Sequence, residues 1–183
     1  MAVTTLDPKT ALILIDLQKG IVAIDTAHRT DAVIGNAARL ADAFRERGLP
    51  VVLVNVTGGA PGRNETPPPA GERPADWAEV VSEVNPADDD IRVTKQTWGA
   101  FTNTDLDQQL KSRGVTQVVL AGISTSAGVE STARFAHELG YHVTLATDAM
   151  TDRVAATHDH SVDVIFPRLG ETGTTEEILA LFP

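Results

Sequence analysis

The chain has 183 residues, of which 42% are hydrophobic, and this is enough to bury a substantial core in a single domain spanning residues 1–183. Its formal net charge of -10 argues against an extended nucleic-acid surface, which needs clustered lysines and arginines. The absence of cysteine excludes disulfides, thiolate metal sites and cysteine nucleophiles, so any chemistry must use carboxylate, hydroxyl, amine, imidazole or bound water.

The N-terminal region carries no targeting pattern. Lys9 is the one basic side chain before the first apolar run, residues 11–15. That run is too short for the core of a signal peptide and far too short to span a bilayer. We therefore expect a cytoplasmic protein that has neither membrane nor nucleic acid among its partners.

Five short apolar runs of largely β-branched residues recur along the chain, at residues 11–15, 51–56, 91–94, 117–121 and 142–146. Their hydrophobicity is continuous rather than alternating, which is typical of strands covered on both faces in a parallel sheet. Segments with apolar residues at helical spacing lie between most of these runs. They are residues 33–44 before Gly48, a segment that Thr104 would cap and Gly114 would end, and residues 129–139 before Gly140. The order predicts a three-layer α/β/α domain with a mostly parallel, Rossmann-like sheet of about six strands.

Residues 58–74, with the sequence GGAPGRNETPPPAGERP, interrupt this rhythm. Their glycines and proline run exclude a central strand or a helix interior. For so long a loop two roles stay equally open: part of a site or an oligomer contact, or a plain surface excursion.

Three polar features follow predicted strands, where open α/β sheets bind their ligands. Asp16 follows ALILI, Lys95 follows IRVT, and the stretch AGISTSAGVESTAR begins at the end of QVVLA. An Asp–Lys pair in a cleft is suited to proton transfer, because burial raises the pKa of the carboxyl and a nearby cation lowers it. The alternatives are that Asp16 caps a turn and that Lys95 is a solvated surface charge.

The turn that begins with Ser124 offers hydroxyls and a glycine. Thr125 or Ser126 is well placed to cap a helix starting near Gly128, and no G-x-S-x-G pattern marks a serine nucleophile. A serine nucleophile would also need a base within hydrogen-bond reach. Gly128 would let substrate or water approach the backbone beside helix N–H groups, although a packing glycine is the alternative.

The remaining polar clusters favour no metal or other cofactor. His158, Asp159 and His160 read as an exposed polar patch, because alternate positions on a helix diverge. The acidic triplet at residues 88–90 reads as a solvated turn before a strand. The aromatic residues Trp77, Trp98 and Phe101 serve as apolar walls of a site or as core, and we favour core.

Three motifs in order make the chain similar to the isochorismatase-like hydrolase superfamily, also called the cysteine hydrolases. They are ALILIDLQKG, VTKQTWGAFTNTDL and GISTSAGVESTAR, the last followed by GYHVTLATDAMTD. The resemblance covers nearly the whole chain and implies a sheet of order 3-2-1-4-5-6 with an active site of Asp, Lys and usually Cys. Gly128 stands at the position that matches the cysteine, as it does in isochorismatases proper, which cleave a vinyl ether without a covalent enzyme intermediate. The metal-binding Asp and His residues of nicotinamidases find no match around NVTGGAPGRN.

The resemblance assigns Asp16, Lys95 and Gly128 to catalysis. Asp16 would protonate the enol-ether carbon, water would add to the oxocarbenium ion, and Lys95 would hold Asp16 and any substrate carboxylate. The small residues STSA replace the bulky turn usual in isochorismatases, so the pocket wall differs. The residues expected to bind substrate are Gln18, Trp98, Phe101, Ser124, Thr125 and Ser126.

The function we expect is a hydrolase that acts non-covalently on a small, anionic metabolite and needs no cofactor. One alternative is an amide or ester hydrolase with Ser124 or Ser126 as nucleophile. The other is a catalytically silent binding or assembly protein of the same fold. Because members of the superfamily commonly assemble, we also expect a homo-oligomer, with the proline-rich residues 58–74 as a candidate contact.

Overall fold

A six-stranded parallel sheet forms the centre of the computed structural model, which describes residues 3–66 and 71–182. The sheet order β3-β2-β1-β4-β5-β6 confirms the expected topology, and every neighbouring pair of strands is parallel. The middle of the proline-rich segment, residues 67–70, lies outside the described residues. The strands are β1 (Thr10–Ile15), β2 (Val51–Val56), β3 (Ile91–Lys95), β4 (Gln117–Ile123), β5 (His142–Thr151) and β6 (Glu171–Gly173).

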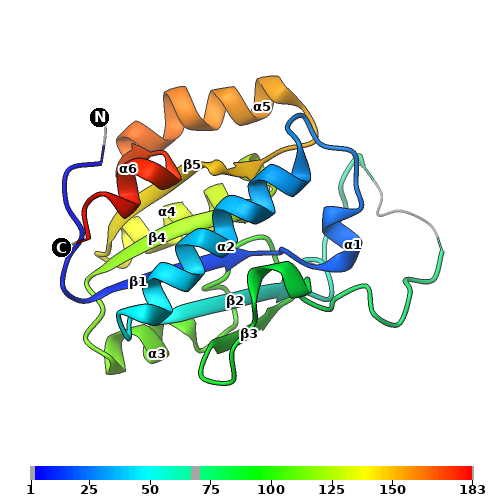
Figure 1. The fold of residues 1–183 in the computed structure, drawn as a ribbon. Coiled ribbons are helices and arrows are strands. Elements are labelled where there is room, and N and C mark those ends of the chain that lie inside the picture. Colours follow the sequence, from blue (N-terminus) through cyan, green and yellow to red (C-terminus); the bar gives the residue numbers. More distant parts are fainter. Residues whose placement is uncertain (1–2, 67–70, 183) are drawn as a thin grey trace.

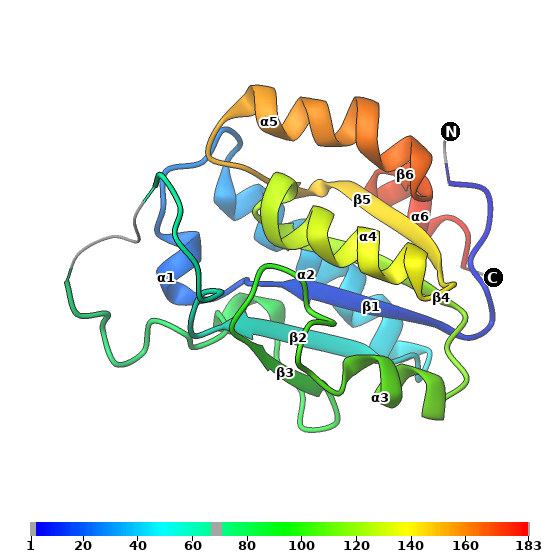
Figure 2. The ribbon, with the colours of Figure 1, turned by 180° about the vertical axis from the view of Figure 1, so that it is seen from behind.

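Helices cover both faces of the sheet. The long helix α2 (Thr30–Glu46) and the short α6 (Thr175–Leu179) lie on the face toward the viewer in Figure 1, whereas α3 (Leu106–Ser112) and α4 (Glu130–Glu138) lie on the face toward the viewer in Figure 2. Helix α5 (Ala155–His160) runs on through a π-helical turn, Ser161–Ile165, and a 3-10 turn, Phe166–Arg168. The short α1 (Lys19–Val22), the 3-10 turn Ser82–Val84 and a π-helical turn, Thr125–Val129, complete the helical elements of the described residues.

Strand β1 shows why the fold buries its sheet on both sides. All six of its residues are buried, and successive side chains point to opposite faces. Leu12 and Leu14 join the core beneath α2, while Ile13 and Ile15 join the core beneath α3 and α4. The continuous apolar runs of the sequence therefore correspond to strands that pack against helices from both layers.

Two elements depart from the pattern expected from the sequence. Strand β5 runs on to Thr151, five residues past its apolar run, and pairs with β4 across an irregularity between Leu120 and Gly122. The sixth strand, β6, has only three residues and no apolar run, so hydrophobic patterning could not mark it. None of the helices in the described part of the chain is long and apolar enough to cross a membrane.

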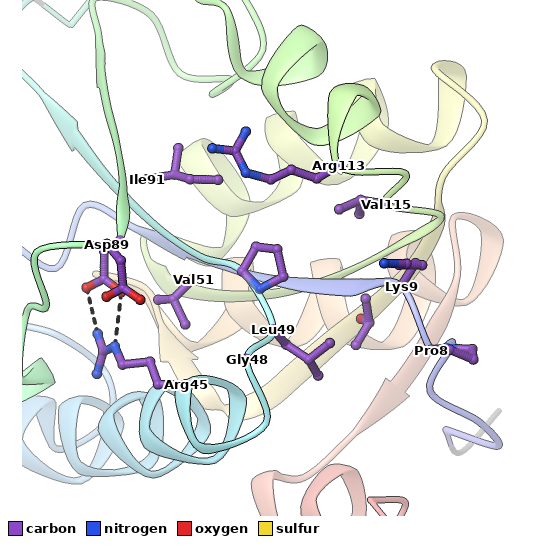
Figure 3. A pocket seen from close by; sticks show the side chains of 13 residues that line it. Pro8, Lys9, Arg45, Gly48, Leu49, Val51, Asp89, Ile91, Arg113 and Val115 are labelled. Atoms are coloured by element: carbon purple, nitrogen blue, oxygen red, sulfur yellow. Dashed lines mark hydrogen bonds and ion pairs between the residues drawn. The ribbon is translucent and has the colours of Figure 1, made fainter.

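A cavity of about 420 Å³ lies at the amino ends of the strands, where Thr10, Val51 and Ile91 begin β1, β2 and β3 (Figure 3). Asp90 at its rim corrects the expectation of a fully solvated acidic turn. It is only 8% exposed and binds Arg45 through two contacts, Nε to Oδ1 at 3.0 Å and Nη2 to Oδ2 at 2.9 Å. Arg45, in α2, thus holds the start of β3 against this helix. This ion pair lies at the amino ends of the strands, on the opposite edge of the sheet from their carboxyl ends.

Candidate active site

The carboxyl edge of the sheet brings Asp16 and Lys95 together. Asp16 follows β1 directly and Lys95 is the last residue of β3, with β2 between the two strands. The Lys95 Nζ donates to the Asp16 Oδ2 at 2.7 Å and to the carbonyl oxygen of Thr97 at 3.1 Å. Asp16 is 5% exposed and Lys95 is 2% exposed. The structure therefore places both expected charges in one buried pair, and neither is a turn cap or a solvated surface group.

Burial dominates the electrostatics of the Asp16 carboxyl. Loss of hydration raises its pKa from 3.8 to about 6, although the charge and hydrogen bond of Lys95 act to lower it. The second oxygen, Oδ1, is buried and has no hydrogen-bond partner among the described residues. Asp16 also has a left-handed backbone, with φ of 53°, and its N–H donates to Val54. A carboxyl with this pKa exists in both protonation states near neutral pH, as proton transfer requires.

Gly128 leaves open the space beside this carboxyl. A Cβ at position 128 would lie 3.3 Å from the Asp16 Oδ2 and 3.0 Å from the Cγ2 of Ile15. Gly122 in β4 lies near the same end of β1. Its φ of 124° suits glycine, and a Cβ there would clash with the carbonyl oxygen of Ile15. The two glycines allow β4 and the following turn to approach the end of β1 closely.

The pair opens into a cavity of about 580 Å³, a volume typical of small-molecule sites. Gly128 and Ser124 line it, and so do residues of α1 and of the described ends of the proline-rich segment. Trp98 is 68% exposed and lines the cavity, which contradicts our preference for a core role. The half-buried Trp77 lines it as well, under the guanidinium of Arg73 at 4.0 Å from the ring centroid.

Two of the residues expected to bind substrate lie in the interior and contact other parts of the chain. Gln18 is fully buried, and its side chain accepts from the N–H of Val56 at 2.7 Å and donates to the carbonyl oxygens of Val56 and Trp77. Phe101 lies in the core, stacked on Tyr141 with 6.0 Å between ring centroids. Neither side chain is among the described residues that line the cavity.

The hydroxyls of the turn divide between the cavity and the interior. Ser124 lines the cavity, and its expected role in substrate binding stays a prediction. Ser126 donates its N–H and its hydroxyl to the Asp152 Oδ2, both at 2.7 Å, and Thr125 is fully buried. The side chains of Thr125 and Ser126 therefore anchor the turn to the rest of the protein. They cap no helix, because the turn is π-helical (Thr125–Val129) and continues directly into α4.

His158 is the partner of Thr125 that sequence reasoning missed. It is 8% exposed rather than part of an exposed patch, and its Nδ1 lies 2.8 Å from the Thr125 Oγ1 in a hydrogen bond. The ring of His28 packs on it with 4.6 Å between centroids, and the Nδ1 of His28 lies 3.0 Å from the Thr151 hydroxyl. The described residues hold no group of three or more His, Cys, Asp or Glu side chains that could bind a metal ion. Helix α5 thus supports the turn that carries Gly128.

Replacing His158 with alanine should lower the free energy of unfolding by about 2 kcal/mol at pH 7.5, because a buried ring and a buried hydrogen bond are lost. Burial and the neighbouring His28 lower the pKa of His158, so the wild type itself loses stability as the pH falls below about 6.5, and the deficit should shrink there. Urea unfolding of the wild type and the variant, at pH 7.5 and at a pH below 6.5, measures the difference in stability at each pH. The exposed His160 in the same helix is the matched control, and His160→Ala should change stability by less than about 0.5 kcal/mol.

The parallel sheet, its strand order and the buried Asp–Lys pair at its carboxyl edge define an α/β protein of the isochorismatase fold. The chain belongs to the isochorismatase family, because the Isochorismatase domain model matches residues 10–177. It is 48% identical over 178 residues to the isochorismatase family protein YwoC of Bacillus subtilis, with 93% of each chain covered. It is 42% identical over 177 residues to YecD of Escherichia coli O157:H7, with 93% of this chain and 94% of the relative covered.

A solved isochorismatase family protein from Burkholderia thailandensis has the same fold. The TM-score is 0.93 at 38% identity, and 97% of each chain is covered. More distant relatives include proteins named as a ureidoacrylate amidohydrolase and as a probable isochorismatase. Members of the family are thus hydrolases.

Proposed function

We propose that the protein hydrolyses a small metabolite without a covalent intermediate, with Asp16 as proton donor and water as nucleophile. The observation that carries this proposal is the Asp16 carboxyl, which is buried at the cavity, has a raised pKa and keeps one oxygen without a partner among the described residues. The chain has no cysteine, so a covalent thioester is excluded, and we assign the attack to water.

A vinyl ether is the bond that suits this arrangement best. The proton of Asp16 passes to the terminal carbon of the C=C bond, and the neighbouring carbon becomes an oxocarbenium ion. Water adds to that carbon and returns a proton to the Asp16 carboxylate, and the resulting hemiketal breaks its C–O bond to give a ketone and an alcohol. Lys95, 2.7 Å from Asp16, stabilises the carboxylate that exists between the two proton transfers.

The contacts of the turn weigh against the serine alternative. The Ser126 hydroxyl is held by Asp152, and the imidazole of His158 is engaged by the buried Thr125 rather than by a serine. Ser124 lines the cavity, but no described His side chain is hydrogen-bonded to it.

The test is a screen of vinyl ethers, amides and esters of small acids, run in parallel on the wild type and on Asp16→Asn. The proposal expects turnover of a vinyl ether that Asp16→Asn abolishes. Turnover that Asp16→Asn leaves intact would contradict it, and labelling of Ser124 by a serine-directed phosphonate would favour the serine hydrolase. Absence of turnover across all three classes would favour a silent binding protein.

Gly128→Ala should lower kcat/KM for the best compound of this screen at least about tenfold, because the new methyl group would crowd the face of Asp16 where water and substrate meet. Stability should change by no more than about 1 kcal/mol, since Ile15 must shift by only a few tenths of an ångström and alanine favours a helix. Steady-state kinetics and thermal unfolding measure the two effects. The control is Gly35→Ala in α2, where a Cβ meets nothing within 4 Å and turnover should stay unchanged.

A further inference from the structure

The cavity pairs apolar walls with several charges. Its apolar side chains include Ile21, Ile24, Trp77 and Trp98, which suit a compact apolar or planar body. Apart from the Asp16–Lys95 pair, the described residues that line it include three charged ones, Glu72, Arg73 and Arg153. The chemistry of the substrate therefore depends on which of these charges are free to meet it.

Two of the three cations in the cavity are already engaged. The Lys95 ammonium is buried and donates to Asp16 and to the carbonyl oxygen of Thr97, so it is poorly placed for the second role we expected, binding a substrate carboxylate. The Arg73 guanidinium donates to the carbonyl oxygen of Thr57 at 2.9 Å and lies over the ring of Trp77.

Arg153 differs from both. It is exposed, lines the cavity with Ser124 and Gly128, and its guanidinium has no acceptor among the described residues. The acid next to it in sequence, Asp152, is occupied: its Oδ1 accepts the backbone N–H of Arg153 at 2.7 Å, and its Oδ2 accepts both donors of Ser126. Asp152 therefore ties the Arg153 backbone to the turn at Gly128 and leaves the guanidinium free.

We propose that Arg153 binds the carboxylate of the substrate, which places the substrate among small acids with a compact apolar body. This rests on the proposed function for the reaction itself. A guanidinium presents two parallel N–H donors that match a carboxylate. The apolar body then contacts Trp77 and Trp98, which line the cavity together with Asp16, and the bond to be broken faces Asp16. The negative charge of Glu72, which also lines the cavity, repels the carboxylate and limits the affinity of the substrate.

The chain carries its own reporter of this binding, because its two tryptophans both line the cavity. Benzoate, benzamide and inorganic phosphate are titrated against tryptophan fluorescence, with isothermal calorimetry as a second measurement. Wild type should bind benzoate at least about fivefold more tightly than the uncharged benzamide, since only benzoate pairs with the guanidinium. Binding of inorganic phosphate as tight as that of benzoate would overturn the assignment to a carboxylate.

Arg153→Ala should remove the preference for benzoate and leave benzamide binding unchanged, while Arg153→Lys should keep part of it. Glu72→Gln should tighten benzoate about twofold by removing the opposing charge. The matched control is Arg168→Ala, which removes an exposed arginine outside the cavity and should alter neither affinity.

Equal affinities of the wild type for benzoate and benzamide would overturn the proposal, and so would a preference that survives Arg153→Ala. Calorimetry that detects neither compound at millimolar concentration would overturn it as well. Asp16→Asn separates this result from the reaction: if it abolishes turnover and keeps the benzoate preference, both proposals stand. If turnover survives in Asp16→Asn while Arg153→Ala loses the preference, the reaction is refuted and the carboxylate subsite remains.

Discussion

Replacing Asp16 with asparagine should lower kcat for the best vinyl ether of the screen about a thousandfold at pH 6, because general acid catalysis contributes factors of this order and asparagine has no proton to give. Asparagine is nearly isosteric and can still accept the hydrogen bond of Lys95, so KM should change little. Steady-state kinetics measure both constants. The loss of kcat at constant KM is what separates a lost proton donor from a distorted cavity.

The pH dependence of kcat in the wild type shows whether Asp16 donates a proton or accepts one. Burial raises the pKa of Asp16 to about 6, so the protonated fraction is about half at pH 6, about a tenth at pH 7 and about a hundredth at pH 8. A proton donor therefore predicts that kcat decreases as the pH rises through 6. If Asp16 acted as a base instead, as it would toward an amide, kcat would increase over the same range. An increase would contradict the vinyl-ether mechanism and favour an amidohydrolase.

Arg168→Ala is the control for this profile, because it removes a charge without touching the cavity and should reproduce the wild-type curve. A curve with no inflection between pH 5 and 7.5 would show that the titrating group is not the one that transfers the proton.

Sequence reasoning located the sheet because its strands are buried on both faces. Such strands need continuous apolar runs, and the runs that include Ile13 and Val52 could be recognised without knowledge of their neighbours. Strand β6 could not, since its three residues are positioned by pairing with Thr144 to Ala146 rather than by their own burial pattern. The helical spacing likewise placed α4 but not the π-helical turn before it, which depends on Thr125 and its distant partner.

The candidate site could be predicted where the order of the strands in the sheet is enough to bring residues together. Asp16 and Lys95 follow strands that end at the same edge of a parallel sheet, so their convergence follows from topology. His158 was misread because its burial comes from contact with the turn at Thr125 and with His28, both distant in sequence. Arg153 carries no local signal either, since its free guanidinium depends on the engagement of Asp152 with Ser126.

Replacing Lys95 with methionine should lower the free energy of unfolding by about 3 kcal/mol at pH 8, because the variant leaves a buried carboxylate without its counter-ion. Lys95 acts to lower the pKa of Asp16, and its loss should raise that pKa further above 6. The sign of the pH effect follows. A carboxyl whose pKa is higher in the folded state than in the unfolded state binds its proton more tightly when folded, so stability falls as the pH rises toward the folded pKa.

The deficit of Lys95→Met should therefore be small at pH 5, where Asp16 is protonated in both proteins, and should grow above pH 6 as the wild-type carboxyl ionises beside its lysine. Urea unfolding at pH 5 and pH 8 measures it. The double variant Asp16→Asn/Lys95→Met contains neither charge, so it should recover most of the stability at pH 8 and show little difference between the two pH values. A deficit of equal size at both pH values, persisting in the double variant, would assign the loss to the packing of the lysine stem and not to the charge on Asp16.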